Sequence, residues 1–403
     1  MEKQHLENLK KCSRCGGCQA HCPLYTETGR EQFVARGKIE LLEHLVEGDL
    51  QWNDKLAQIF STCLLCGSCR DNCPNGVKAD KLVLASRKEL VADRGLPILK
   101  KNVFQHLLKY NGRLNALGKV IYLYQNLGVQ KLVRRSRLLK LLPGDIAGME
   151  ALLPPVASGP FRKTVPQLIK IDRPRLKIAY FTGCITNLIN HHVGHSILKI
   201  MKAYNVEVVI PDQVCCGVPA FASGDFETGR FLGEKNLDEF AKYHVDYIIT
   251  DCASCLSTWL EYPELLESDI AKVLAAKVMD INRFLVEVLD IKPVLPPVPK
   301  NPGLKVTYHD PCHLKRTPGG KSAPRELLKR LSPVYEFVEM GLADRCCGSA
   351  GSFNLSHYRL SQAVAAHKVK SILETKASFV ASACPSCLMQ LDHACGRTWQ
   401  GDV

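Results

Sequence analysis

Residues 12–23 read CSRCGGCQAHCP, and residues 63–74 repeat the pattern as CLLCGSCRDNCP. In both stretches two residues separate the first three cysteines, three residues precede the fourth, and a proline follows it. Thiolates spaced so closely along a chain are typical metal ligands. The repeated stretch therefore predicts that the N-terminal part of the chain folds around metal centres.

This spacing is the cysteine run of bacterial ferredoxins, and two copies predict two [4Fe–4S] clusters. The proline turns the chain away, so that the fourth cysteine of each run ligates the other cluster. Structural zinc sites also use C-x2-C pairs, but they do not need four thiolates at this spacing twice over. We assign one cluster to Cys12, Cys15, Cys18 and Cys73, and the second to Cys63, Cys66, Cys69 and Cys22. An amphipathic helix is expected at residues 36–47, between the two runs.

The overall composition is that of a globular protein with several domains. The chain has 403 residues, of which 46% are hydrophobic and 23% charged, and it contains 19 cysteines. A chain of this size does not need disulfides for stability, so the thiols point to metal in a reducing compartment. We find no secretory signal and no apolar run long enough to cross a bilayer, and a cytoplasmic protein is expected.

The cysteines of the C-terminal half form a second repeat. Each set consists of a single cysteine, a Cys-Cys-Gly sequence and a C-x-x-C pair, and the two sets are offset by 128 to 132 residues. CCG site 1 comprises Cys184, Cys215, Cys216, Cys252 and Cys255, and CCG site 2 comprises Cys312, Cys346, Cys347, Cys384 and Cys387. Five thiols exceed the four of a tetrahedral zinc site and favour an iron–sulfur cluster in each set, although zinc or a mixed site stays open. The glycine after each cysteine pair is expected to allow a sharp turn with positive φ.

Strand-like and helix-like segments alternate around these cysteines. Strands are expected at residues 177–181, 206–210 and 246–250, and again at 305–308, 334–338 and 378–381; helices are expected at 187–204, 225–243 and 356–374. This alternation predicts a duplicated α/β domain with each cysteine group at the carboxyl end of a strand. The fold class is therefore multidomain α+β and α/β. The expected domains are residues 1–93, 94–176, 177–293 and 303–403, with a proline-rich joint at 294–302.

Residues 94–177, the basic segment, carry the positive charge of the chain. They hold seventeen Lys and Arg against three Asp and Glu, a net charge of +14. We expect helices over residues 96–142 and an extended crossing over 143–175. The segment is compatible with a solvated surface, with docking on an acidic partner, or with peripheral binding to anionic lipid at the cytoplasmic face of a membrane. No nucleic-acid recognition module is present, and nucleic acid is not an expected partner.

No catalytic residue is assigned in this chain. A Gly-rich dinucleotide fingerprint at a strand–helix turn is absent from the sequence, so flavin or nicotinamide chemistry is expected on another chain. His191, His192 and His195 fall on one predicted helix and are interpreted as packed or solvated side chains. His309 and His313 flank Cys312 and are candidates for outer partners of a cluster, which tune its potential.

Together, the twin cysteine run, the phrase Ala-Arg-Gly-Lys-Ile at residues 35–39 and the two complete CCG sites resemble the iron–sulfur subunit of bacterial glycolate oxidase and its D-lactate dehydrogenase relatives. The resemblance implies a flavin-containing 2-hydroxyacid dehydrogenase partner and transfer of electrons to quinone or another acceptor. The CCG sites also resemble those of heterodisulfide reductase, in which five cysteines hold a non-cubane [4Fe–4S] cluster. Three alternatives remain: the iron–sulfur subunit of anaerobic glycerol-3-phosphate dehydrogenase, a catalytic heterodisulfide-reductase-like subunit, and a zinc scaffold without redox activity.

Overall fold

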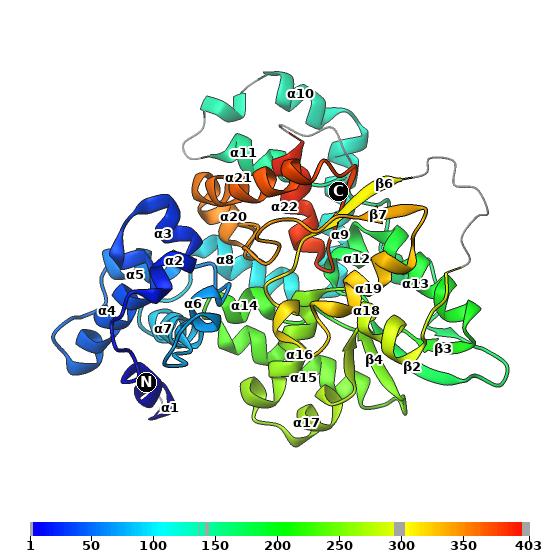
Figure 1. Ribbon diagram of the computed structural model, residues 1–403, viewed down its shortest axis with the longest axis horizontal. Helices are drawn as coiled ribbons and strands as arrows, with labels where there is room; N and C mark the ends of the chain where they lie inside the picture. Colours follow the sequence, from blue (N-terminus) through cyan, green and yellow to red (C-terminus); the bar gives the residue numbers. More distant parts are fainter. Residues whose placement is uncertain (1–2, 137, 142–144, 294–302, 397–403) are drawn as a thin grey trace.

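The computed structural model describes residues 3–136, 138–141, 145–293 and 303–396. Figure 1 shows a helical domain (blue) at one end and two α/β units (green, and yellow to red) beside it. The arrangement confirms the predicted fold class. The proline-rich joint expected at residues 294–302 lies outside the described residues.

Short helices build the N-terminal domain around the two cysteine runs. The helix expected at residues 36–47 is confirmed as α4, which ends where Gly48 adopts a φ of 87°. Leu9, Leu42 and Phe60 are buried in the core of this domain. The elements are α1 (Lys3–Leu9), α2 (Gly17–His21), α3 (Pro23–Thr28), η1 (Glu31–Phe33), α4 (Ala35–Glu47), α5 (Asp54–Ser61), α6 (Ser68–Asp71) and α7 (Ala79–Arg94).

The first α/β unit has a sheet of strand order β1-β3-β2-β4-β5, in which β2 to β5 are parallel. Ile178 and Tyr180 face one hydrophobic cluster while Ala179 and Phe181 face another, as the alternation along a strand requires. The sheet is therefore covered on both faces. Its strands are β1 (Leu168–Ile169), β2 (Leu176–Phe181), β3 (Val206–Val209), β4 (Tyr247–Thr250) and β5 (Val278–Asp280). Its helices are α12 (Cys184–Leu188), α13 (His191–Ala203), α14 (Val218–Ala222), α15 (Phe226–Phe240), α16 (Ala253–Leu266), α17 (Asp269–Ala275), α18 (Ile281–Arg283) and the π-helix η5 (Phe284–Val288).

The second unit repeats this plan with a sheet of order β7-β6-β8, again parallel. The long helix expected at residues 356–374 is found as α21, preceded by the short α20. The strands are β6 (Leu304–Tyr308), β7 (Tyr335–Phe337) and β8 (Phe379–Ala381). The helices are η6 (Leu314–Arg316), α19 (Ser322–Arg330), α20 (Phe353–Ser356), α21 (Tyr358–Thr375) and α22 (Pro385–Cys395).

Two predicted elements need correction. Residues 187–204 do not form one helix, because the chain leaves the helical conformation at Ile189 and divides it into α12 and α13. Residues 143–175 are not simply extended, since the structure places α11, a 3₁₀ turn and β1 among them. Strand β1 pairs antiparallel with β3 and covers the otherwise open edge of the first sheet. The linking elements are α8 (Ile98–Asn102), the π-helix η2 (Val103–Leu108), α9 (Asn111–Asn126), α10 (Val129–Ser136), η3 (Leu138–Leu141), α11 (Ile146–Ala151) and η4 (Phe161–Lys163).

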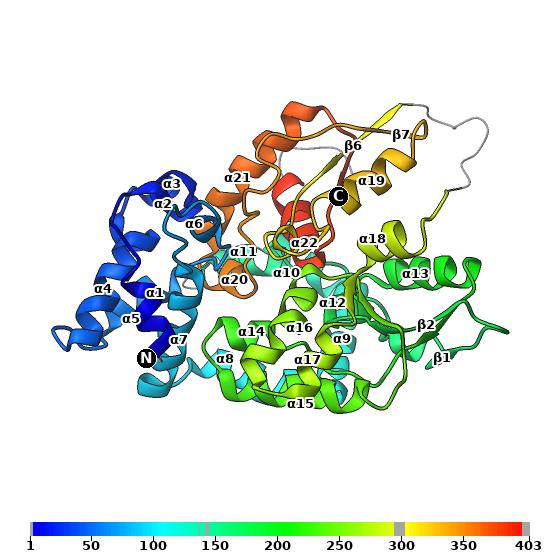
Figure 2. The same ribbon diagram turned by 60° about the horizontal axis from the view of Figure 1, so that its bottom comes forward.

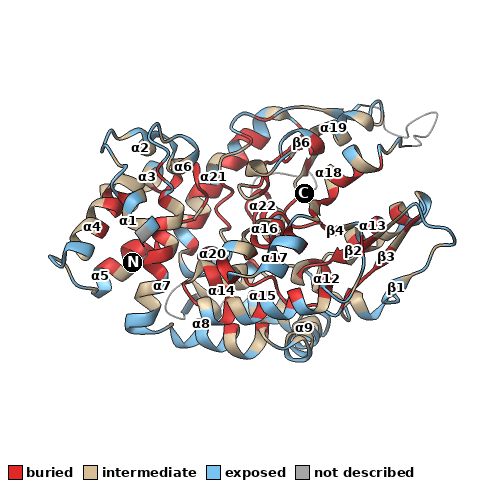
Figure 3. Ribbon diagram, turned by 90° about the horizontal axis from the view of Figure 1, so that it is seen from below, coloured by how far each residue is buried: buried red, intermediate tan, exposed pale blue. Residues whose placement is uncertain are grey.

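The three parts share buried contacts. One hydrophobic cluster contains side chains from both α/β units, among them Phe181, Trp259 and Leu391. A smaller cluster joins Leu24 and Leu64 of the N-terminal domain to Phe353 and Val364 of the second unit. Figure 2 shows α3 beside α21, and Figure 3 shows buried residues along α16 and α22 at the centre of the molecule. The cysteine groups of the three parts are therefore held in fixed relation to one another.

Candidate metal centres

The two ferredoxin-type runs fold alike. In the first, Arg14 and Gly16 have φ of 56° and 82°, and in the second the corresponding Leu65 and Gly67 have φ of 50° and 65°. These left-handed residues curl each loop so that its cysteines face a common centre, and the backbone N–H of Leu65 points at Cys63 Sγ, 3.4 Å away. Helices α2 and α6, which follow the loops, contact each other. The two runs are thus brought together as a pair.

The fourth cysteine of the first run lies beside the second run. Burial, together with the nearby thiolates of Cys66 and Cys63, raises the pKa of the Cys22 thiol to about 11. Burial and the same two thiolates also raise the pKa of Cys69. In the other group, Cys12 lies close enough to Cys18 to raise its pKa, although burial is the larger cause. Cys12 and Cys73 pack against the same hydrophobic cluster, as does Cys69 of the second run, and Cys15 is exposed.

Two buried cations near the second run were not singled out from the sequence. Lys38 is 2% exposed and donates to the Phe33 carbonyl at 2.6 Å. Burial lowers its pKa, while Cys63 and Cys22 act in the opposite direction. Arg87 donates to the carbonyl oxygens of Ser61 and Cys63 at 2.8 and 2.7 Å, and also to Ala222 in the first α/β unit. Both side chains place positive charge where the thiolates gather, and the Ala-Arg-Gly-Lys-Ile phrase was the only signal for Lys38.

The five thiols of CCG site 1 converge from three strand ends. Cys184 begins α12 after β2, the Cys215–Cys216 pair follows β3, and the last two cysteines lie at the start of α16 after β4. Thiol hydrogen bonds link Cys184 to Cys215 and Cys216 to Cys255. Because Cys215 and Cys255 both donate to it, the pKa of Cys216 lies well below its usual value. This placement at the carboxyl edge of the sheet confirms the expected position.

CCG site 2 has the same arrangement. Cys346 makes thiol hydrogen bonds with Cys312 and Cys347, and Cys347 makes one with Cys387. The predicted sharp turns are confirmed, because Gly217 and Gly348 have φ of 87° and 89°. A Cβ at Gly348 would lie 2.5 Å from the Ser361 carbonyl oxygen, so the turn also needs glycine for space. Lys368 is 1% exposed and lies near this pair, where it donates to the carbonyls of Leu342 and Ala343.

The cysteine groups are also in contact with one another. Cys66 of the second ferredoxin-type run makes a thiol hydrogen bond with Cys346 of CCG site 2. Cys384 of CCG site 2 makes one with Cys252 of CCG site 1, and the backbone N–H of Ala253 donates to the Ala383 carbonyl at 3.0 Å. A cavity of about 1110 Å³ is lined by Cys63 and by the cysteines of both CCG sites. Sulfur atoms therefore follow one another from the N-terminal domain through both α/β units.

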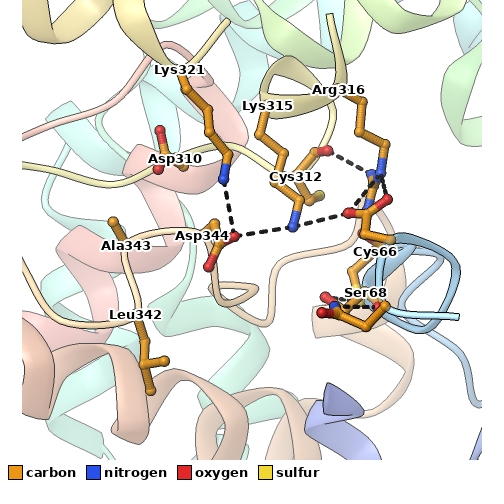
Figure 4. A network of polar contacts seen from close by, with 12 residues as sticks. Cys66, Ser68, Asp310, Cys312, Lys315, Arg316, Lys321, Leu342, Ala343 and Asp344 are labelled. Carbon is orange, nitrogen blue, oxygen red and sulfur yellow. Dashed lines mark hydrogen bonds and ion pairs between the residues drawn. The ribbon is translucent and has the colours of Figure 1, made fainter. Parts of the chain in front are cut away.

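Arg316, in η6 after Cys312, joins the second α/β unit to the second ferredoxin-type run. Its guanidinium forms two bonds to the Asp71 carboxylate and donates to the backbone carbonyls of Cys66 and Cys312. Figure 4 shows Arg316 directed toward Cys66, with Lys315 beside it. A Cβ at Gly67 would collide with the guanidinium, so glycine is required there for contact as well as for its positive φ. In the sequence, the adjacent Lys315 and Arg316 were the only signal for this contact between the second α/β unit and the second ferredoxin-type run.

Two of the histidines that the sequence places on one helix have ordinary packing roles. The His191 ring bonds to the Asn187 carbonyl at 2.9 Å, and the His195 ring packs edge-on against Phe161. His313 lies nearer to the thiols, since its Nδ1 is 3.1 Å from Ser254 Oγ, which in turn is 3.7 Å from Cys384 Sγ. His313 is therefore placed as an outer partner of CCG site 2, through Ser254.

The donor set fits iron–sulfur clusters. All nineteen cysteines are free thiols, and apart from Cys395 they gather in the groups described above. The CCG thiols are largely buried, lie close enough to stabilise one another's thiolates, and receive backbone N–H groups, as when Gly348 N approaches Cys346 Sγ at 3.5 Å. Thiolate-only donor sets select iron–sulfur clusters or zinc, and five thiols in one group exceed the four that zinc takes.

The basic segment presents apolar and positive side chains on the surface. Leu127, Leu132 and Leu141 are 73%, 68% and 82% exposed. Lys131 and Arg135 on α10 are exposed, whereas Arg134 pairs with Glu150 at 2.8 Å. Within the described residues, no helix combines the length and the apolar character needed to cross a membrane. The segment is thus an exposed amphipathic surface, and α10 stands at the edge of the molecule in Figure 1.

Comparison with known families matches each part of the chain. Residues 8–77 match the 4Fe-4S dicluster domain, residues 95–153 match the linker region of the glycolate oxidase iron-sulfur subunit, and residues 178–259 and 306–392 each match the cysteine-rich domain. A "probable glycolate oxidase iron-sulfur subunit" of Bacillus subtilis is 32% identical over 97% of this chain and 90% of its own length. One of the fumarate reductase (CoM/CoB) subunits of Methanothermobacter marburgensis is 27% identical over 99% of this chain and 71% of its own length. Lactate utilization protein A of Geobacillus thermodenitrificans is 31% identical over 55% of this chain and 92% of its own length.

Proposed function

The chain belongs to the family of glycolate oxidase iron-sulfur subunits, and from this premise we propose that it carries electrons between a flavin-containing dehydrogenase of glycolate or D-lactate and quinone or another acceptor. The hydroxyacid chemistry is assigned to the partner chain. This chain is proposed to hold two [4Fe–4S] clusters on the cysteines of the ferredoxin-type runs and one further iron–sulfur cluster in each CCG site. When bound, such clusters take up and release single electrons.

The observation that carries this proposal is the continuous contact between cysteine groups. Cys66 meets Cys346, and Cys384 meets Cys252, so the second ferredoxin-type group adjoins CCG site 2 and CCG site 2 adjoins CCG site 1. Electrons are therefore proposed to pass in this order or its reverse. The residues of this chain orient the cysteines and exclude water: Arg316 fixes the first contact, and the bond from Ala253 to Ala383 fixes the second.

The proposal is tested by anaerobic purification of the tagged chain with its bound subunits. Glycolate, D-lactate and glycerol 3-phosphate are then added separately, and cluster reduction is followed by electron paramagnetic resonance. We expect a flavoprotein to co-purify and glycolate or D-lactate to reduce the clusters. Cys346→Ser should interrupt reduction beyond one group, whereas Cys395→Ser, which changes a buried cysteine outside every group, should leave it intact. Reduction by none of the hydroxyacids, or a colourless protein loaded with zinc, would reject the proposal.

The cavity favours a second candidate function. Because its walls carry the thiols of both CCG sites, a small disulfide bound between them would be reduced by clusters on either side. This corresponds to the heterodisulfide-reductase-like alternative. The chain without its partners, reduced by an artificial donor, should then convert a small disulfide to thiols catalytically, whereas an electron-transfer subunit should not.

Contact with a membrane is the last part of the proposal. The acceptor would be a membrane quinone, and the basic segment would bind the anionic cytoplasmic surface through Lys131 and Arg135 on α10 and the exposed leucines around them. Each cation near an anionic leaflet contributes about 1 kcal/mol, so a few are enough for reversible binding. The alternative use of this surface is docking on an acidic protein partner.

A further inference from the structure

His309 is a buried histidine whose ring lies against the thiols of CCG site 2. It directly follows β6, where its backbone N–H donates to the Ala381 carbonyl at 2.9 Å and its carbonyl accepts from Ser382 Oγ at 3.1 Å. The side chain is 1% exposed, and among the described residues neither ring nitrogen has a nitrogen or oxygen partner. The ring instead contacts the Cys347 thiol, whose pKa it helps to lower. A buried imidazole without a nitrogen or oxygen partner is unusual, because most buried polar side-chain atoms are hydrogen-bonded.

The nearest groups to this ring are thiols of CCG site 2. A ring nitrogen of His309, Cys347 Sγ and Cys387 Sγ all lie within 4.8 Å of one another. Cysteine sulfur and histidine nitrogen bind transition metals at about 2.3 and 2.0 Å, so three donors at this spacing can converge on one metal ion with small movements of their side chains. Imidazole suits iron as well as zinc. The three side chains thus form a mixed sulfur and nitrogen donor set.

CCG site 1 has no equivalent of this histidine. The duplication aligns β2 with β6 and Cys184 with Cys312, an offset of 128 residues, and this places Phe181 at the position of His309. Phe181 packs edge-on against Trp259 at a ring separation of 5.4 Å and lies beside Phe240. Two halves that share all five cysteines therefore differ at this position, where Phe181 ends β2 and His309 follows β6.

We propose that His309 ligates a metal ion of the group held at CCG site 2, together with Cys347 and Cys387. This inference rests on the proposed function, because it takes that group to be an iron–sulfur cluster. CCG site 1 then has thiolate donors only, whereas CCG site 2 also has a neutral imidazole. Where imidazole replaces thiolate as a ligand of an iron–sulfur cluster, the reduction potential rises. Removing the imidazole is accordingly expected to lower the reduction potential of the group at CCG site 2.

The test uses the full chain, purified anaerobically after growth with ¹⁵N-labelled histidine. Pulsed electron paramagnetic resonance of the reduced protein should show the strong hyperfine coupling of a directly coordinated nitrogen. The coupling should disappear in His309→Gln while the ferredoxin-type signals remain, and one redox transition should move to lower potential. The exposed His106 provides the control, since His106→Gln should change neither signal. His309→Cys, which supplies a thiolate, should retain the cluster without the nitrogen coupling.

The outcomes separate this inference from the proposed function. Iron at CCG site 2 without nitrogen coupling, or coupling that persists in His309→Gln, overturns ligation by His309. The wild-type measurement decides the point even if the variant fails to assemble. Zinc without iron in the CCG sites rejects the iron–sulfur assignment, and zinc-edge absorption spectroscopy of wild type and His309→Gln then shows whether a nitrogen ligand is lost.

Discussion

Arg316 and Asp71 are 245 residues apart in the chain, yet Arg316 Nε lies 2.9 Å from one carboxylate oxygen of Asp71 and Nη2 lies 3.0 Å from the other. Lys315 forms a further ion pair with this carboxylate, since its Nζ is 3.1 Å from Asp71 Oδ2. Bidentate pairs of this kind fix orientation as well as contributing energy. Because Asp71 belongs to the second ferredoxin-type run and Arg316 follows Cys312, the pair sets the position of one cysteine group against another.

Removing this arginine should loosen the junction without removing metal. In Arg316→Ala, the carbonyls of Cys66 and Cys312 and the half-buried Asp71 lose their donor, and local opening of residues 63–73 should become easier by about 2 kcal/mol. Hydrogen exchange of these residues measures the change. Arg330→Ala removes a similarly buried arginine paired with Asp290 and Glu326, away from the junction, and should not alter it. Equal exchange in the two variants would contradict the assignment.

Replacing Cys22 tests which cluster it ligates. Since Cys22 lies beside Cys63 and Cys66, Cys22→Ser should damage the cluster assigned to Cys63, Cys66 and Cys69 and remove up to about four irons. Iron analysis and electron paramagnetic resonance provide the measurement, with Cys395→Ser as the control. If the loss is confined to the cluster of Cys12, Cys15 and Cys18, the crossed assignment is wrong.

Asp280 should make the first α/β unit sensitive to pH. Burial raises the pKa of this carboxyl to about 6, although its Oδ1 caps α18 by accepting from the backbone N–H groups of Asn282 and Arg283. In the unfolded chain the pKa of an Asp carboxyl is about 3.9, so the folded protein holds this proton more tightly than the unfolded chain. The resulting contribution to stability is fully present below about pH 3.9 and is lost as pH rises through about 6. Asn caps a helix as well as Asp does and cannot ionise.

Asp280→Asn should therefore be more stable than wild type by about 3 kcal/mol at pH 8 and by about half as much at pH 5. Unfolding by urea at the two pH values, followed by circular dichroism under anaerobic conditions, measures this difference. Asp269 is exposed and pairs with Lys272, so Asp269→Asn should show no such gain. An advantage of Asp280→Asn that does not grow with pH would disprove the explanation.

Charge on α10 should control binding to anionic vesicles. Lys131→Gln with Arg135→Gln removes two exposed cations and leaves Arg134, whose pairing with Glu150 holds α10 to α11. The double variant should lose about 2 kcal/mol of vesicle binding, roughly a thirtyfold change, and wild-type binding should weaken with salt. Co-sedimentation with anionic and neutral vesicles measures it. Lys242→Gln with Lys272→Gln is a control of equal charge, and similar losses in both double variants would show that net charge alone acts.

Local patterns in the sequence predicted much of the local structure. Apolar runs of strand length predicted six strands within one or two residues, and the glycines at 217 and 348 predicted the turns, because these are local steric requirements. Strand β5 (Val278–Asp280) was not predicted. The crossing at residues 143–175 was predicted poorly, since β1 forms only by pairing with the edge of β3. A two-residue strand has no periodicity of its own.

Long-range contacts of the candidate sites could not be predicted in the same way. Nothing local to Cys66 or Cys346 indicates that their thiols meet, because this depends on how the N-terminal domain docks on the second α/β unit. Arg316 acquires its role by the same docking, and Arg87 by contact of the N-terminal domain with the first α/β unit. Lys38 depends on the folding of the N-terminal domain itself. His309 was singled out only as a neighbour of Cys312, and its approach to Cys347 and Cys387 follows from the packing of three strand ends.

The bond from Ala253 to Ala383 has a consequence for the two halves of the repeat. If two identical subunits met through their C-x-x-C segments around a twofold axis, every contact would occur twice. Here the reciprocal bond cannot form, because the position that matches Ala253 is Pro385, which has no N–H. A homodimer must carry any substitution in both copies, whereas a tandem chain can change one copy alone. Covalent fusion of the halves is thus what permits Phe181 in one and His309 in the other.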